Sequence, residues 1–190
     1  MIEGLSGFYP DWNYDWFILI NSVWSSPFLE AVLPSLRHKL FWIPLYLFII
    51  SFLIINHQKK GIWAVAFCLL SFGLSNTISA EIMKPYFKID RPCNDPVFKT
   101  HVETRIRCGG GKSFPSAHAT NHFALSAYLF FILRRKYKKT FLPLALWAAT
   151  VSYAQVFVGV HYPVDIMIGG AIGITIGFLV AKFYNLTVRL

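Results

Sequence analysis

Charged residues are scarce in this chain. Asp, Glu, Lys and Arg together make up 14% of its 190 residues, well below the rough quarter that a soluble globular domain needs to cover its surface. Hydrophobic residues make up 55%, and the mean hydropathy is +0.49. The shortage of charge excludes a soluble domain, and the high hydrophobicity excludes a disordered chain. The composition therefore indicates one membrane-embedded unit.

Acidic residues are scarcer still. Nine acidic residues face 18 Lys and Arg residues, which gives a net charge of +9. In a soluble protein such an excess suggests nucleic acid, but in a membrane protein it suggests cytoplasmic loops or a site for an anionic substrate. We therefore expect no nucleic-acid partner. The sequence also lacks an internal repeat, a low-complexity stretch and the features of a cleaved signal peptide.

Apolar runs that can cross a bilayer need roughly 17 to 25 residues. Such runs cover residues 40–56, 61–83, 116–133, 141–160 and 163–183. The first is the shortest, but it contains no charge, and the flanking Lys39 and Lys59 can extend toward water. We therefore predict an all-α membrane protein, a helical bundle of about five transmembrane helices.

Two shorter apolar runs, residues 16–23 and 28–36, precede the bundle. They are interrupted by prolines and edged by tryptophans, which prefer the headgroup level of a membrane. We predict interfacial helices in residues 1–38, followed by a catalytic transmembrane domain in residues 39–190. A sixth crossing over residues 15–36 is the alternative, and it would place Glu30 inside the bilayer.

Five spans would create two sets of loops with different charge. One set, with the adjoining helix end, carries nine cations and no acid: Lys59, Lys60, Arg134, Arg135, Lys136, Lys138, Lys139, Lys182 and Arg189. By the positive-inside rule this set is cytoplasmic. The outward set nevertheless carries seven cations: Lys84, Lys88, Arg91, Lys99, Arg105, Arg107 and Lys112. Those seven need an explanation other than orientation.

The same topology brings three reactive clusters to the outer face. Lys84 and Arg91 follow the second span, Pro115-Ser116-Ala117-His118 opens the third, and His161 to Asp165 joins the fourth to the fifth. Lys and Arg bind phosphate, and a serine at the start of a helix adds donors for an anion. A carboxylate near a histidine orients the ring and leaves its other nitrogen free to attack. Two histidines, one carboxylate and a cationic cradle suit phosphoryl transfer through a phosphohistidine.

With these residues the sequence resembles the type 2 phosphatidic acid phosphatase family, whose fold is shared with vanadium haloperoxidases. The family has three motifs, Lys-x6-Arg-Pro, Pro-Ser-Gly-His and Ser-Arg-x5-His-x3-Asp. The matching residues are Lys84, Arg91 and Pro92 for the first, Pro115, Ser116 and His118 for the second, and His161 and Asp165 for the third. The resemblance covers roughly residues 39–183, and three ordered motifs are far more specific than one.

Three positions depart from the family pattern, and one of them is Ala154, which stands where the third motif has Ser. Ala117 stands where the family usually has Gly, which adds one methyl group and keeps the backbone N–H. Gln155 stands where the third motif has Arg, so one charged phosphate ligand is missing. Gln155 could still donate a hydrogen bond. A cation of the outer loop could supply the charge, and the candidates are Arg105, Arg107 and Lys112.

The resemblance implies an integral membrane phosphatase that acts on a lipid at the outer face of the bacterial cytoplasmic membrane. Lys84, Arg91, Ser116, Ala117 and Gln155 are the expected phosphate ligands. The expected catalytic residues are His161 as nucleophile, Asp165 as its orienting partner and His118 as acid and base. No metal or other cofactor is expected. The candidate substrates are undecaprenyl diphosphate, a lipid A phosphate, phosphatidylglycerol phosphate and phosphatidate.

Several alternatives remain open at this level. A catalytically silent protein that binds or transports anionic lipid is the second functional hypothesis, and the absent charge at Gln155 is its support. His118 and His122 lie four residues apart, a spacing that can bind a metal, but no third ligand at a fixed spacing accompanies them. We predict a disulfide between Cys93 and Cys108 in the outer loop, with free thiols as the alternative. The oligomeric state is unknown.

Overall fold

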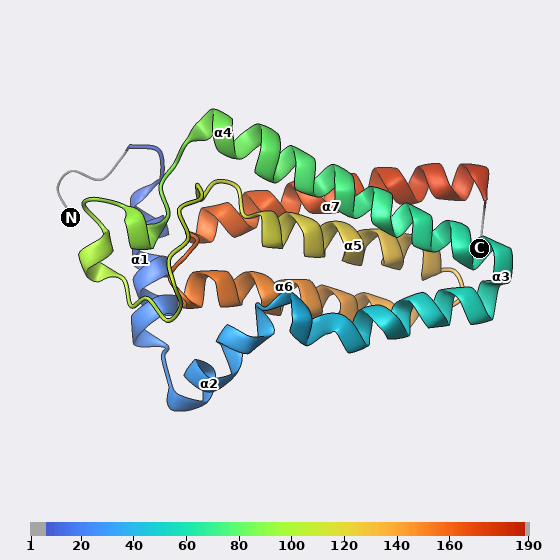
Figure 1. The fold of residues 1–190 in the computed structure, drawn as a ribbon, viewed down its shortest axis with the longest axis horizontal. Coiled ribbons are helices and arrows are strands. Elements are labelled where there is room, and N and C mark those ends of the chain that lie inside the picture. The colour runs from blue at the N-terminus through green and yellow to red at the C-terminus, as the bar shows by residue number, and fades with distance from the viewer. Residues whose placement is uncertain (1–6, 189–190) are drawn as a thin grey trace.

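A computed structural model describes residues 7–188 and shows a bundle of long helices (Figure 1). The helices are α1 (Asp11–Ile18), α2 (Pro27–Leu36), α3 (Ile43–Asn76), α4 (Lys84–Phe87), α5 (Ala117–Leu133), α6 (Phe141–Phe157) and α7 (Pro163–Thr187). The π-helical segments η1 (Leu19–Val23) and η3 (Thr77–Met83) continue α1 and α3. Short 3₁₀ turns are η2 (Lys39–Trp42), η4 (Pro92–Asn94), η5 (Lys99–His101) and η6 (Lys138–Thr140). The prediction of an all-α bundle is confirmed.

Helix α3 is a hairpin of two arms. The backbone is non-helical at Gln58, where φ is 50°, and Figure 1 shows the chain turning back there. The second arm is tied to its neighbours, because the Tyr128 hydroxyl donates to the Ala64 carbonyl (2.9 Å) and the Tyr184 hydroxyl donates to the Lys60 carbonyl (3.0 Å). The two arms occupy the first two apolar runs of the sequence. The chain thus forms five long helical arms from α3, α5, α6 and α7.

By length and hydropathy alone, three stretches among residues 7–188 could cross a membrane: Lys39–Asn94, Lys138–Phe157 and Pro163–Thr187. The first of these contains the hairpin turn of α3. Helix α5 lies within the bundle but has only 17 residues. A bent pair, Asp11–Val23 with Pro27–Leu36, would add a fourth stretch if its 112° bend lay within one span. The number of crossings therefore stays a prediction.

Helices α5 and α7 approach each other unusually closely because α7 presents glycines at every fourth position. A Cβ atom on Gly169 would lie 2.8 Å from the Ser116 carbonyl oxygen, and one on Gly173 would lie 2.3 Å from the Thr120 carbonyl oxygen. Such small-residue stripes let helix backbones touch in membrane bundles. The close contact fixes the start of α5 beside the start of α7, and both starts carry motif residues.

The bundle has two chemically different ends. One end, here named the site end, holds the starts of α5 and α7, the end of α6, α4 and the loop of residues 88–115 (Figure 1). The opposite end, here named the far end, holds the α3 turn, the loop between α5 and α6, and the C-terminal part of α7. All three sequence motifs lie at the site end.

The N-terminal segment packs onto the site end. Helix α1 lies across the ends of the bundle helices (Figure 1). The Asn13 side-chain oxygen accepts from the Val164 N–H (2.9 Å), and the Asn21 side-chain amide donates to the Phe157 carbonyl (2.8 Å). The buried rings of Phe17 and Tyr162 pack in one apolar core. The N-terminal helices therefore form part of the structure around the motifs, and the domain boundary at residue 38 stays a prediction.

Candidate functional site

His161 and Asp165 are positioned by the turn that joins α6 to α7. Gly159 has φ of 86°, and a Cβ atom there would lie 2.8 Å from the Val102 side chain, so the turn requires glycine. Asp165 accepts the Tyr162 N–H through Oδ2 (2.8 Å), as a cap of α7. The same Oδ2 lies 3.3 Å from His161 Nδ1. One carboxylate thus starts the helix and orients the histidine.

Two further hydroxyl groups hold the Asp165 carboxylate. Tyr9 donates to Oδ1 and Ser113 donates to Oδ2. The Ser113 oxygen also lies 3.3 Å from His161 Nδ1, and the Ser113 N–H donates to the Ile89 carbonyl (2.8 Å). The sequence analysis did not identify either residue. Ser113 stands two positions before Pro115, which could have indicated it, whereas no sequence signal marks Tyr9.

The His161 ring is buried, and this burial controls its protonation. Burial lowers the pKa of His161 to about 4, because desolvation penalises the imidazolium, and the nearby Asp165 carboxylate opposes the effect. His161 is therefore neutral at neutral pH. With Nδ1 directed at the carboxylate, Nε2 is the nitrogen that can act as a nucleophile.

The second motif lies at the N-terminus of α5. The Ser116 N–H donates to the Asp165 carbonyl (3.1 Å), and its hydroxyl accepts the Ala119 N–H (3.4 Å) as the helix cap. This bond joins the starts of α5 and α7. Ala117 is the first helical residue, where the positive end of the helix dipole favours an anion. The predicted anion ligands of this motif therefore adjoin the His161–Asp165 pair.

His118 occupies the first turn of the same helix and is backed by a row of aromatic rings. Its ring is parallel to that of His122, with 6.5 Å between centroids, and His122 contacts the Trp147 ring at 5.1 Å. His122 Nδ1 lies 2.8 Å from the His118 carbonyl oxygen. His118 and His161 are close enough for their charges to interact. The two predicted catalytic histidines therefore lie near each other, His118 in α5 and His161 in the turn before α7.

The first motif contributes two half-buried cations. The Lys84 ammonium donates to the Lys112 carbonyl (2.8 Å). The Arg91 guanidinium lies against Gly109–Gly111, here named the glycine loop. Cβ atoms on Gly109 and Gly111 would lie 3.4 and 3.5 Å from its terminal nitrogens. The charges of Lys84 and Arg91 both act on His161. The fold therefore brings residues of all three motifs together.

Gln155 lies at the site end of α6 and is completely buried. Neither its side-chain nitrogen nor its side-chain oxygen has a hydrogen-bond partner among the described residues. A buried amide without partners costs about 1–3 kcal/mol. Such a group is suited to a ligand that supplies the missing partner.

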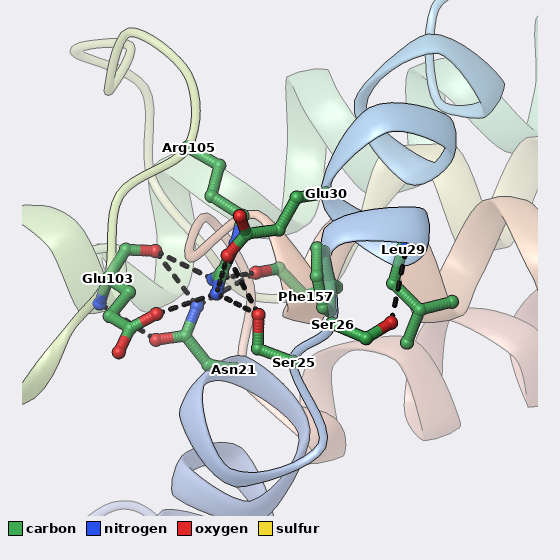
Figure 2. Close-up of polar contacts among 8 residues, drawn as sticks. All are labelled: Asn21, Ser25, Ser26, Leu29, Glu30, Glu103, Arg105 and Phe157. Atoms are coloured by element: carbon green, nitrogen blue, oxygen red, sulfur yellow. Dashed lines mark hydrogen bonds and ion pairs between the residues drawn. The ribbon is translucent and has the colours of Figure 1, made fainter.

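The outer-loop cations that could replace the absent arginine have other environments. Lys112 pairs with Asp90 at 2.7 Å, and Arg107 is exposed. Arg105 lies in a separate polar cluster, which Figure 2 shows between α2, the outer loop and the end of α6. Two of the three candidates are therefore already engaged by protein carboxylates.

The terminal nitrogens of Arg105 have acceptors within the protein, although its Nε atom is buried without a hydrogen-bond partner among the described residues. Its guanidinium contacts the Glu103 carboxylate (2.6 Å), the Glu30 carboxylate (3.3 Å), the Ser25 hydroxyl (2.9 Å) and the Phe157 carbonyl (2.9 Å) (Figure 2). It also lies over the Phe157 ring at 4.2 Å. Arg105 therefore ties the N-terminal helices to α6 and is not free to bind phosphate.

A cation that no motif includes lies near the site. Arg37 follows α2 and is half-buried, and its Nε atom has no hydrogen-bond partner among the described residues. Its charge acts on His118. Burial lowers the pKa of Arg37, and the nearby charge of Arg91 lowers it further. The sequence offered no signal for Arg37, since it belongs to a segment read as an interfacial helix.

The outer loop is closed by a disulfide. Cys93 and Cys108 are joined, with their Cα atoms 6.1 Å apart, and the Asn94 side chain donates to the Gly109 carbonyl (3.1 Å). This closure holds the glycine loop above Arg91. Residues 7–188 contain no group of three or more His, Cys, Asp and Glu residues that could hold a metal ion. Independence from metals stays a prediction.

Comparisons with known proteins agree with this geometry. The family model of the PAP2 superfamily matches residues 61–189. The lipid A 4'-phosphatase of Bacteroides thetaiotaomicron is 32% identical over 197 aligned residues, which cover 100% of this chain and 83% of that protein. The lipid A 4'-phosphatase of Porphyromonas gingivalis is 31% identical, with 88% and 71% covered.

A solved structure has the same fold. The transmembrane PAP2-type phosphatidylglycerolphosphate phosphatase of Bacillus subtilis superposes with a TM-score of 0.72. The match covers 96% of this chain and 90% of that chain, at 20% sequence identity. At this identity the likeness concerns the fold alone.

Proposed function

This chain belongs to the PAP2 superfamily and is a membrane lipid phosphatase, and from that premise we propose that it removes the 4'-phosphate of lipid A through a phosphohistidine. Two curated relatives that align over most of the chain carry that activity in their names, which favours lipid A over the three other candidate lipids. The observation that carries the mechanism is the buried His161–Asp165 pair, which faces His118 among several cations.

In the first step, the phosphate group is held by Lys84, Arg91 and the start of α5 at Ser116 and Ala117, with Gln155 as an uncharged donor. His161 Nε2 attacks phosphorus, and Asp165 stabilises the proton on Nδ1. A nitrogen–phosphorus bond forms as the bond to the sugar oxygen breaks. His118 donates a proton to that leaving oxygen, so the dephosphorylated lipid departs as an alcohol.

In the second step, His118 takes a proton from water as the water oxygen attacks phosphorus. The nitrogen–phosphorus bond breaks, phosphate leaves, and His161 returns to its neutral state while His118 regains its proton. Cationic side chains offset the negative charge of the phosphate throughout. The cycle therefore needs no metal ion in this proposal.

An apolar cavity supports a lipid substrate. It has a volume of about 330 Å³ and lies between α3, α5 and α6, with Phe48, Leu129 and Trp147 among its walls. Trp147 contacts His122, which lies beside His118. An acyl chain in this cavity would contact Trp147, whose ring packs in a row with those of His122 and His118. The phosphate would remain in the polar site.

The charge of the two ends supports an orientation. The far-end loops are rich in Lys and Arg and contain no acid, which favours the cytoplasmic side. The site end would then face away from the cytoplasm at the bacterial inner membrane. Accessibility of single introduced cysteines at Lys138 and Arg107 to a membrane-impermeant thiol reagent in intact cells tests this orientation. Labelling at residue 138 but not at residue 107 would reverse it.

The activity is tested with a panel of four lipids in detergent: lipid A, undecaprenyl diphosphate, phosphatidylglycerol phosphate and phosphatidate. We expect the largest kcat/KM for lipid A, with release of the 4'-phosphate and full activity in EDTA. His161→Ala and His118→Ala should each lower kcat by at least about 10³-fold. Undiminished hydrolysis in either variant would refute the assigned roles, and a larger kcat/KM for another lipid would replace the substrate.

The phosphohistidine is tested by acid quenching in the presence of ³²P-labelled substrate. Only a brief quench on ice followed at once by transfer to alkaline detergent preserves such a label, and we expect it to be acid-labile, alkali-stable and dependent on His161. A wild-type protein that binds lipid A but neither releases phosphate nor becomes labelled would instead be a silent lipid-binding protein.

A further inference from the structure

The site has one cation fewer than its motif pattern requires. Gln155 replaces the arginine of the third motif, and its buried amide has no partner among the described residues. A phosphate monoester near neutral pH carries between one and two negative charges. Lys84 and Arg91 are the two cations of the matching motifs, and Lys112 and Arg105 are paired with carboxylates.

Contacts along the chain place Arg37 beside the site. The Trp42 indole N–H donates to the Leu36 carbonyl (2.6 Å), one residue before Arg37. Trp42 packs against Trp147 at 6.0 Å, and Trp147 packs against His122 at 5.1 Å. The end of α2 is therefore fixed to the same row of rings that supports His118.

The environment of Arg37 is that of a ligand-binding group rather than a structural one. No hydrogen bond or ion pair joins its side chain to any described residue, and its Nε atom is buried. The charge of Arg91 acts on Arg37, and Arg91 also has a buried Nε atom without a partner among the described residues. An anion that contacts both half-buried guanidinium groups would offset their repulsion and their desolvation. Arg105 also has a buried Nε atom without a partner, but its terminal nitrogens contact five acceptor atoms of the protein, whereas those of Arg37 contact none among residues 7–188.

We propose that Arg37 binds the substrate phosphate together with Arg91 and supplies the guanidinium that the third motif lacks. This inference rests on the proposed phosphatase function and extends its binding site into the N-terminal segment. Arginine presents two parallel donors to phosphate oxygens, so a second guanidinium can hold the group from another side.

Arg37→Gln tests the proposal, because glutamine keeps much of the stem and removes the charge. We expect kcat/KM to fall about 10- to 100-fold and the affinity for inorganic phosphate to fall about tenfold, with an unchanged melting temperature. Lys39→Gln is the matched control, since Lys39 is an exposed cation of the same segment, and it should stay within about twofold of wild type. Retention of wild-type phosphate affinity and kcat/KM in Arg37→Gln would overturn the proposal.

A second-site variant separates binding from structure. Arg37→Gln combined with Gln155→Arg returns a guanidinium to the site from α6, and recovery of phosphate affinity supports a shared role. The phosphate-binding measurement also separates this inference from the proposed function. If the wild-type protein hydrolyses none of the four lipids, the proposed function fails, yet a loss of phosphate binding in Arg37→Gln still supports the role of Arg37.

A different observation concerns the far end, away from the catalytic histidines (Figure 1). A cavity of about 330 Å³ lies between the ends of α5 and α7. Its walls carry three cations and no acid: Arg134, Arg135 and Lys182, with Asn185 and the apolar Phe131, Phe178 and Leu186. The Arg134 guanidinium lies 5.0 Å from the centre of the Phe131 ring.

This cationic cavity adjoins an apolar one. A second cavity of about 230 Å³ lies between α5, α6 and α7 and shares Phe131 as a wall. Its other walls include Phe130, Phe141 and Ile174, and its lining is almost entirely apolar. A polar, cationic space that continues into an apolar one matches the shape of a phospholipid, and basic pockets between membrane helices bind anionic headgroups.

We infer that the far end binds an anionic phospholipid, with its headgroup at Arg134, Arg135 and Lys182 and an acyl chain along Phe131. This ligand would be a bound lipid of the membrane and not the substrate. Charge complementarity is the reason for the choice, because the cavity holds three cations and no carboxylate to pair with them.

Native mass spectrometry of delipidated protein tests this site with phosphatidylglycerol, phosphatidylethanolamine and inorganic phosphate. We expect the protein to retain at least fivefold more phosphatidylglycerol than phosphatidylethanolamine. The phosphatidylglycerol adduct should be lost in Arg134→Ala/Arg135→Ala/Lys182→Ala. The control Lys59→Ala/Lys60→Ala/Lys138→Ala removes equal charge from the same end outside the cavity and should keep the lipid. Equal loss in both triple variants, or displacement by inorganic phosphate, would overturn a lipid-specific site.

Discussion

Two polar clusters at the site end differ in whether their arginine side chains have partners within the protein. Around Arg105, every charged group has a partner of opposite sign within the protein (Figure 2). Around Asp165, the carboxylate accepts hydrogen bonds from three donors, but no hydrogen bond or ion pair joins the side chains of Arg37, Arg91 and Gln155 to any residue within 7–188. The Arg105 cluster therefore holds structural elements together, whereas the cluster around Asp165 has the unpaired groups that the proposed anion would contact.

The comparison predicts which substitutions affect catalysis and which affect only stability. Substitutions of Asp165, whose carboxylate already accepts hydrogen bonds from the protein, should remove activity because they disturb His161 directly. Changes at Arg105 should loosen the N-terminal helices and leave the chemistry intact.

The largest effect is expected from Asp165→Asn. The amide keeps an acceptor for the Tyr162 N–H but no longer stabilises a cationic His161, so kcat should fall about 10³- to 10⁴-fold. Asp90→Asn is the matched control, because Asp90 pairs only with the half-exposed Lys112 in the outer loop, and it should stay within about threefold. Steady-state hydrolysis of lipid A measures both, and comparable losses would show that the effect is not specific to the histidine.

A smaller effect is expected from Tyr9→Phe. It removes one hydroxyl donor from the Asp165 carboxylate while the ring still packs against Tyr162 at 4.8 Å. We expect kcat to fall about tenfold, since a hydrogen bond to a charged group contributes about 1.5–3 kcal/mol, with KM nearly unchanged. Tyr184→Phe removes a buried hydroxyl at the far end, where it donates to the Lys60 carbonyl, and serves as the control. A rise in KM with constant kcat would place Tyr9 at the substrate instead.

The pH dependence distinguishes a buried histidine from an exposed one. Burial lowers the pKa of His161 to about 4, so the ring gains its proton only as the pH falls through about 4. At pH 5.5 the free enzyme keeps a neutral nucleophile, whereas an ordinary histidine, with a pKa of about 6.5, would be roughly nine-tenths protonated. NMR titration of labelled histidine, assigned by His161→Ala, measures the midpoint. A midpoint near 6.5 would contradict the burial of this ring.

The smallest effect on catalysis is expected from Arg105→Ala. Loss of its contacts with Glu103, Glu30 and the Phe157 carbonyl should lower the melting temperature by about 2–6 °C and leave kcat/KM of the folded enzyme within about threefold. Thermal unfolding in detergent and kinetics below the transition measure the two quantities. A loss as large as that in Arg37→Gln would remove the distinction between the two arginine clusters.

Much of the arrangement was accessible from the sequence. Apolar runs located the helical arms because a membrane span needs a long run without charge. The motif positions of Lys84, Ser116, His118, His161 and Asp165 lie at one end because successive spans alternate in direction. The all-α fold was predicted correctly on these grounds, and the family was predicted correctly from its motifs.

Other parts of the site were missed because they depend on contacts distant in sequence. Tyr9 and Asp165 are 156 positions apart, and no local pattern links them. Arg105 was a candidate for the missing charge on the basis of its loop alone, and the structure shows its carboxylate partners. The hairpin turn at Gln58, by contrast, follows directly from the short gap between two apolar runs.

The sequence by itself determined that the chain is a helical membrane phosphatase with residues of three family motifs, since residue type and spacing are local properties. Only the tertiary structure decided which cations are available to a ligand. Availability depends on whether a carboxylate or carbonyl from another segment has already paired with the cation. Folding brings such partners to Arg105 and Lys112, whereas Arg37 and Arg91 have none among residues 7–188.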